Sequence, residues 1–120
     1  MNIKSPHAII PVLSSSDIIR DLAWYKKHVG FEPVFNQDGY ACIQRGDMEI
    51  HLQFHLGTAE DPVHGSVIKI FVEDINVELE DMVERGSITY ESLQKSTPWK
   101  THEFSFFDPN KNAIYFVQDV

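Results

Sequence analysis

The sequence is poor in the residues that build disulfide-bonded or zinc-stapled scaffolds. It has 120 residues and a single cysteine, Cys42. One thiol excludes an internal disulfide and leaves too few sulfur ligands for a zinc cluster. We therefore expect Cys42 to be a small, buried, apolar residue of the core.

Long apolar runs and an excess of positive charge are also absent. No segment approaches the ~20 apolar residues of a membrane helix, and the start, Met-Asn-Ile-Lys-Ser-Pro, lacks the apolar stretch of a signal peptide. The formal charge of -8 argues against nucleic acid, whose binding requires Lys and Arg to replace counterions. We expect a cytoplasmic protein that binds neither nucleic acid nor a membrane, and a cationic partner suits its charge better.

Several common catalytic motifs are missing as well. The sequence contains no glycine-rich phosphate loop, no nucleophile elbow and no Cys–His arrangement. Its hydrophobic content of 42% is enough for a chain of this length to bury its own core. The composition therefore predicts one compact domain over residues 1–120.

The first half of the chain alternates between strand and helix patterns. Residues 8–13 form a short apolar run, and Asp17 offers a carboxylate suited to the N-cap of a helix. An apolar stripe with helical spacing runs from Ile18 to Val29, and Gly30 is placed to end the helix. Three strands are then predicted at 31–36, 40–44 and 48–54.

The second half repeats this order. Residues 67–72 predict a strand, Asp74 an N-cap, and Gly86 the end of a second helix. A strand at 88–91, a loop through Trp99 and a hairpin of 104–107 with 113–117 complete the unit. Two tandem βαβββ units, at about 7–55 and 66–118, predict an α+β fold whose paired sheets enclose a trough for a ligand.

This plan, with IIPVLSSSD leading into LAWYKKHVGF, resembles the glyoxalase/bleomycin resistance/dioxygenase superfamily, also called the vicinal oxygen chelate fold. The ordered set PVL, DGYACIQRGD, PW, EFSFFDP and AIYFV is similar to the bleomycin resistance proteins of that superfamily. The resemblance implies a cofactor-free, non-catalytic homodimer. Such proteins exchange their N-terminal strand and hold a cationic glycopeptide antibiotic in clefts between the subunits.

The resemblance also implies which residues line those clefts. The predicted ligand-binding residues are Phe35, Tyr40, His51, Gln53, Lys69 and Trp99. Trp99 would stack on the ligand, although an indole after Pro98 also suits a cover for the end of the sheet. Lys69 stands where an aromatic residue is expected, so its ammonium would repel a cationic drug unless a carboxylate such as Glu49 pairs with it.

The alternative is a metal-dependent glyoxalase- or dioxygenase-type enzyme of the same superfamily. The resemblance implies that enzymes of this superfamily hold a divalent metal with His and Glu side chains, one on the first and one on the last strand of each unit. In the first unit of this chain, His7 and His51 match those two positions. The matching positions of the second unit are Val67 and Tyr115, neither an ordinary metal ligand. The residue pattern therefore favours wall positions for both histidines and no metal. A third role, metabolite binding for regulation, fits the same sequence.

Overall fold

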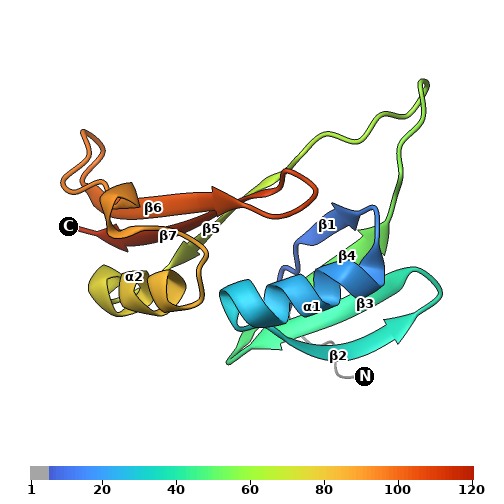
Figure 1. Cartoon of the computed structure of the whole chain (residues 1–120), viewed down its shortest axis with the longest axis horizontal. Coiled ribbons are helices and arrows are strands. Elements are labelled where there is room, and N and C mark those ends of the chain that lie inside the picture. The colour runs from blue at the N-terminus through green and yellow to red at the C-terminus, as the bar shows by residue number, and fades with distance from the viewer. Residues whose placement is uncertain (1–5) are drawn as a thin grey trace.

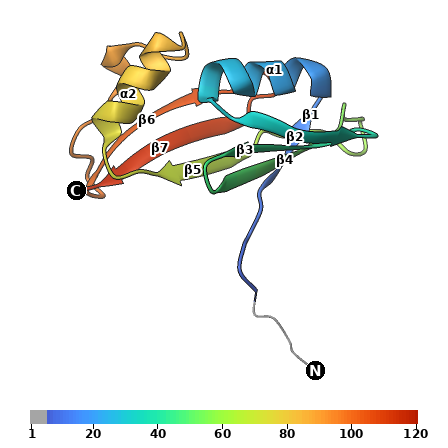
Figure 2. The same ribbon diagram turned by 90° about the horizontal axis from the view of Figure 1, so that it is seen from below.

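The computed structural model describes residues 6–120 and contains two small sheets and two α-helices (Figure 1). The two sheets lie side by side along the long axis of the molecule in both ribbon views (Figures 1 and 2). The first five residues lie outside the described residues, and the expectation that the chain starts without a signal peptide rests partly on them. No helix among the described residues is long and apolar enough to cross a membrane.

The first unit is a four-stranded sheet covered by one helix. Its elements are β1 (Val12–Ser15), α1 (Ile18–Val29), β2 (Glu32–Gln37), β3 (Tyr40–Arg45) and β4 (Met48–Phe54). The strand order is β1-β4-β3-β2, with β1 parallel to β4 and the other pairs antiparallel. Figure 2 shows α1 lying on one face of this sheet, so the opposite face has no helix on it.

The sequence signals at both ends of α1 are confirmed. The Asp17 carboxylate accepts a hydrogen bond from the backbone N–H of Arg20 at 3.0 Å, as an N-cap does. Gly30 has a φ of 78°, in the left-handed region that a helix-ending residue adopts and that costs glycine nothing. Tyr25 and Val29, from the predicted apolar stripe, are fully buried against the sheet.

The second unit has the same order but lacks one strand. Its elements are β5 (Val67–Phe71), α2 (Ile75–Glu84), the short 3-10 helix η1 (Tyr90–Ser92), β6 (Thr101–Phe107) and β7 (Ala113–Asp119), and its sheet order is β5-β7-β6. The predicted strand at 88–91 is wrong. Residues 90–92 form η1 instead, and Ile88 and Leu93 on either side of it both pack against the core. The chain therefore turns through η1 and pairs only at Gln94, in an isolated bridge to Glu103.

The first strand also begins later than the apolar run at 8–13 predicted. It starts at Val12, because Pro11 has no N–H to donate to a sheet ladder. The residues before Pro11 have no regular secondary structure, and Ile9 is 97% exposed. In Figure 2 this segment leaves the sheet on the side opposite α1.

A buried polar network joins α1 to the turn between β6 and β7. The Tyr25 hydroxyl donates to Asp108 at 2.6 Å, and the Asn110 amide donates to the buried Asp21 carboxylate at 2.6 Å. Burial, reinforced by the Asp108 carboxylate, raises the pKa of Tyr25. The turn residues 108–110 thus hold the two units together as well as reversing the chain.

Candidate ligand-binding site

Three of the predicted site residues meet on the helix-free face of the first sheet. The Tyr40 hydroxyl and Nδ1 of His51 are 2.8 Å apart, and the Tyr40 and His51 rings lie 5.3 Å apart, edge to face. The ring of Phe35, which is 42% exposed, lies 6.0 Å from that of His51 in a similar geometry. Gln53 is exposed and pairs with Tyr40 across β3 and β4, so its side chain lies on the same face.

Two further residues of this face were not predicted as site residues. Cys42 is the cross-strand partner of His51, and Glu49 lies two residues before His51 on β4. The Nε2 of His51 lies 3.2 Å from a Glu49 carboxylate oxygen, which can only accept in that bond. Cys42 is 1% exposed, as its assignment to the core predicted, and burial together with Glu49 raises the pKa of its thiol to about 11. The thiol is therefore protonated at neutral pH.

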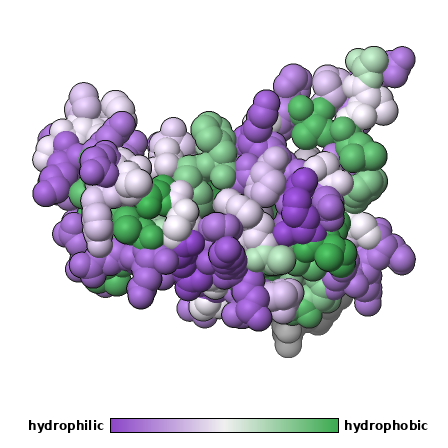
Figure 3. Space-filling view, in the orientation of Figure 1, coloured by the Kyte–Doolittle hydropathy of each residue, from purple (hydrophilic) through white to green (hydrophobic). Residues whose placement is uncertain are grey.

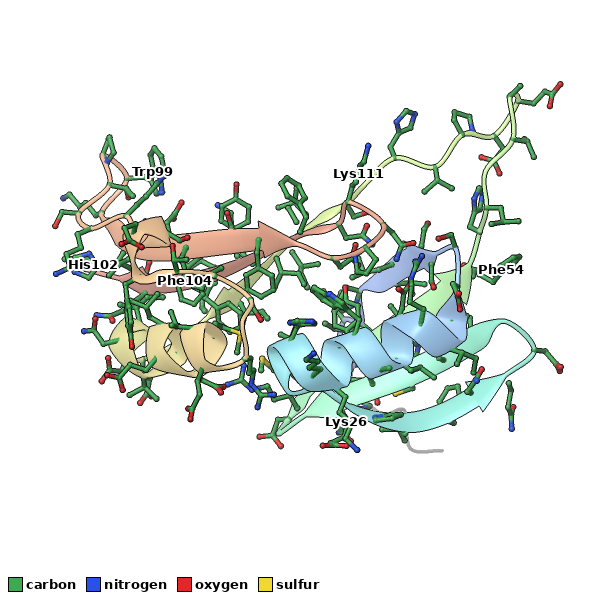
Figure 4. The ribbon with its side chains drawn as sticks, viewed as in Figure 1. Lys26, Phe54, Trp99, His102, Phe104 and Lys111 are labelled. Atoms are coloured by element: carbon green, nitrogen blue, oxygen red, sulfur yellow. The ribbon has the colours of Figure 1, made fainter. Side chains whose placement is uncertain are left out.

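Lys69 and Trp99 belong to the second unit, Lys69 on its sheet and Trp99 on a loop beside that sheet. Lys69 is exposed and pairs with Tyr115 across β5 and β7, and its Nζ stands 5.6 Å from the centre of the Tyr115 ring. Figure 4 shows Trp99 on the loop before β6, on the side of β6 opposite α2. Both residues therefore belong to the helix-free side of their sheet, as the alternation in β5 predicted for Lys69.

Trp99 borders a cavity of about 380 Å³ on that side. The cavity is lined by Ser92, Gln94, Trp99, Glu103, Phe104, Ser105 and Tyr115. Trp99 is 60% exposed, and its indole N–H donates to a Glu103 carboxylate oxygen at 3.1 Å. The Thr101 hydroxyl donates to the same oxygen at 2.8 Å. An aromatic wall next to a carboxylate suits a ligand that is both flat and cationic.

Glu103 is the residue of this cavity that the sequence interpretation missed. Glu103 is only 5% exposed, whereas a glutamate on a small sheet is ordinarily exposed to water. The loop from Ser92 to Lys100 folds back over β6 through the Gln94 bridge and covers the carboxylate. Polar and aromatic residues alternate along this part of β6, and the alternation places Glu103 on the helix-free face. The burial of Glu103 depends on the loop that covers it.

A second cavity, of about 320 Å³, lies beside the segment that precedes β1. It is lined by residues 8–11, Phe31, residues 47–50 and residues 68–71. Glu49 and Lys69 both border it, yet no carboxylate among residues 6–120 lies within 4.0 Å of the Lys69 ammonium. Glu49 bonds to His51 instead, so the ion pair that would screen Lys69 from a cationic drug is not formed.

The residues at the four strand positions of the expected metal site do not form a complete set of metal ligands. Val67 offers no donor atom, and the Tyr115 ring carries the Lys69 ammonium above it, whose charge opposes a nearby divalent cation. His7 is exposed in the segment before β1 and belongs to no group of three potential metal ligands among residues 6–120. The predicted pair of His7 and His51 thus lacks the second half of its ligand set.

The structure thus divides the six predicted residues between two surfaces. Phe35, Tyr40, His51 and Gln53 share the helix-free face of the first sheet, and Lys69 and Trp99 the corresponding side of the second. Hydrophobic side chains also reach the surface at several places in the view of Figure 3. Among the described residues the exposed large ones include Val12, Phe35, Val67, Phe71 and Phe107, all on helix-free sheet faces.

Comparison with known proteins confirms the resemblance drawn from the sequence. The bleomycin resistance protein of Geobacillus stearothermophilus is 25% identical over 133 aligned positions, which cover 92% of this chain and 96% of the relative. A bleomycin resistance protein of Staphylococcus aureus is equally similar. No family model matches the sequence. The chain is thus similar to bleomycin resistance proteins over nearly its whole length.

Solved structures show the same fold. The bleomycin resistance determinant encoded on transposon Tn5 superimposes with a TM-score of 0.77 at 22% identity, covering 95% of this chain and 98% of the other. A bleomycin-binding protein complexed with bleomycin gives 0.76 at 21%, covering 96% and 100%. A glyoxalase-related enzyme from Clostridium phytofermentans gives 0.71 at 16%, covering 98% of each chain. The chain thus has the fold that these bleomycin-binding and glyoxalase-related proteins share.

Proposed function

We propose that this chain is a cytoplasmic, non-catalytic protein that binds and sequesters a flat, cationic small molecule of the bleomycin type, in two symmetric clefts of a homodimer. The observation that carries the proposal is the Trp99 cavity, where an exposed indole stands over the buried carboxylate of Glu103. The similarity to bleomycin resistance proteins over 92% of the chain supports the class of ligand.

The cavity supplies two kinds of attraction for such a ligand. The exposed face of Trp99 offers a stacking surface, which contributes about 0.5 to 1.5 kcal/mol per aromatic pair beyond the area buried. Glu103 offers a carboxylate in a site largely withdrawn from water, where attraction for a cation is stronger than at the surface. The net charge of -8 raises the rate at which cations reach the protein.

A dimer is proposed because the single chain exposes more surface than a compact monomer does, and several large hydrophobic side chains lie on that surface. Its accessible surface of 7990 Å² exceeds the value expected for a compact monomer of this mass by about 1,400 Å². Each partner in a standard interface buries about 800 Å². The helix-free sheet faces with Phe35, Phe71 and Phe107 supply such an area, and the segment around Ile9 leaves its own sheet and can pair with a second copy.

In the dimer the two surfaces of the site would meet. The group of Phe35, Tyr40 and His51 from one subunit and the Trp99 cavity from the other would then form two walls of one cleft. This arrangement explains how predicted site residues can lie on different sheets of one chain. Lys69 would weaken the binding of a cationic drug, because no carboxylate of residues 6–120 lies within 4.0 Å of its ammonium, which stands on the same side of the sheet as Trp99.

Titration calorimetry with bleomycin on the purified chain tests the proposal. We expect saturable binding of one molecule per chain, with light scattering showing a dimer at micromolar concentration. A Glu103→Gln variant keeps the shape of the cavity and removes its charge, so it should weaken binding at least tenfold. A Glu80→Gln variant removes one charge from the exposed surface of α2 and serves as the control. An equal loss of affinity in both variants would mean that only the net charge of the protein matters and would remove Glu103 from the site. The absence of any saturable binding would refute the drug-binding role.

A further inference from the structure

Three side chains with metal-ligating atoms converge on the helix-free face of β3 and β4. They are the Cys42 thiol, the Glu49 carboxylate and the His51 imidazole, and one donor atom from each lies within 4.8 Å of the others. The convergence follows from the register, because Cys42 faces His51 across the strands and Glu49 precedes His51 by two residues. Each donor is therefore held on a sheet rather than on a flexible loop.

The spacing needs only a small contraction to hold an ion. Ligands at about 2.0 to 2.3 Å from Zn²⁺ in tetrahedral geometry lie about 3.3 to 3.7 Å from one another. Nε2 of His51 is already 3.2 Å from a Glu49 oxygen. The 4.8 Å bound on the whole group leaves about 1 Å to close, within the reach of side-chain rotation.

Tyr40 holds the histidine in the orientation that such a site requires. Its hydroxyl lies 2.8 Å from Nδ1 of His51, so Nε2 is the nitrogen aimed at Glu49. A metal-ligating histidine commonly donates its other ring N–H to a neighbouring oxygen, which fixes the ring and raises its basicity. Tyr40 supplies that oxygen, and Phe35 covers the ring from a second side.

We propose that Cys42 Sγ, a Glu49 carboxylate oxygen and Nε2 of His51 bind one divalent cation of the zinc class, with the fourth position open toward the helix-free face. The thiol proton passes to solvent when the metal–sulfur bond forms. A sulfur, nitrogen and oxygen donor set selects Zn²⁺ over Mg²⁺ or Ca²⁺, which prefer oxygen ligands alone. This site differs from that of the superfamily's enzymes, because all three ligands come from one sheet.

The site stands independently of drug binding, and its test uses the metals alone. The purified chain, stripped with a chelator, is dialysed against Co²⁺ and then against Zn²⁺. We expect one Co²⁺ per chain, a near-ultraviolet charge-transfer band from thiolate to cobalt, and loss of that band when Zn²⁺ displaces Co²⁺. Tyr40→Phe should keep the band and weaken metal affinity about tenfold, as changes to groups that orient a ligand do.

Variants of the ligands and one matched control complete the test. Cys42→Ser should abolish the charge-transfer band, and Glu49→Gln, a half-buried position where folding is not at risk, should lower the affinity at least tenfold. The control is His55→Gln, which removes a histidine four residues further on, beside Asp61. No stoichiometric uptake, uptake without the thiolate band, or equal losses in Glu49→Gln and His55→Gln would each overturn the site.

Discussion

Replacing Trp99 with alanine should separate ligand binding from folding. Trp99 is 60% exposed in the free chain, so about 150 Å² of its ~250 Å² side chain is open to a ligand. A flat ligand stacked on one face covers about half of that, worth ~1.9 kcal/mol at ~25 cal/mol per Å². With a stacking contribution of about 0.5 to 1.5 kcal/mol the loss is about 2.4 to 3.4 kcal/mol, or about 60- to 300-fold in affinity.

The same substitution should cost the fold less than a full core truncation. The covered part of the Trp99 side chain, about 100 Å², and its bond to Glu103 are together worth about 2 to 3.5 kcal/mol, once the area term is reduced as an upper bound. A large-to-small change in a core costs about 3 to 5 kcal/mol. The other tryptophan, Trp24, packs on Tyr25 and Phe106 next to the core and provides the matched comparison.

Urea unfolding and bleomycin titration on both variants make the comparison. Trp99→Ala should lower the unfolding midpoint less than Trp24→Ala does and should lose ligand affinity, whereas Trp24→Ala should retain the affinity. Because the chain has two tryptophans, each variant also leaves a single tryptophan, whose fluorescence can be excited selectively at about 295 nm or above, where tyrosine hardly absorbs. Ligand should quench the fluorescence of the chain that retains Trp99 and hardly change that of the other. A Trp99→Ala variant with a low midpoint and full affinity would refute the assignment of Trp99 to the cleft.

Three further variants test other parts of the structure. Lys69→Met should raise the affinity for a cationic drug about three- to tenfold in calorimetry at low salt, and the gain should shrink at high salt; an unchanged affinity would remove Lys69 from the cleft. Ile9→Asp should shift light scattering from dimer toward monomer, and a fully retained dimer would exclude that segment from the interface. The raised pKa of Tyr25 means that its neutral phenol stabilises the fold below about pH 10, the ordinary phenol value, and that this contribution is lost as the pH rises further. Urea unfolding from pH 8 to 11 should therefore show stability falling above pH 10 in the parent chain, and the same slope in Tyr25→Phe would disprove the link.

Local signals in the sequence determined the helices and most of the strands. The caps at Asp17 and Gly30, with the apolar stripe between them, specify α1 through contacts a few residues apart. Alternation along β4 put His51 on the face away from α1 for the same reason, because the side-chain period of a strand is two. The repeated order of elements then carried the resemblance to the superfamily, and the fold followed from it.

Tertiary structure alone decided how the site is assembled. The loop before β6 buries Glu103 through the Gln94 bridge, a contact set by the path of the chain and not by the residues flanking Glu103. Cys42 reaches His51 and nearby Glu49 only because the β3–β4 register places His51 opposite Cys42, and a shift of one residue would turn Cys42 to the other face. Local propensity specifies which face of a strand a residue occupies, whereas pairing and loop packing decide which residues meet there.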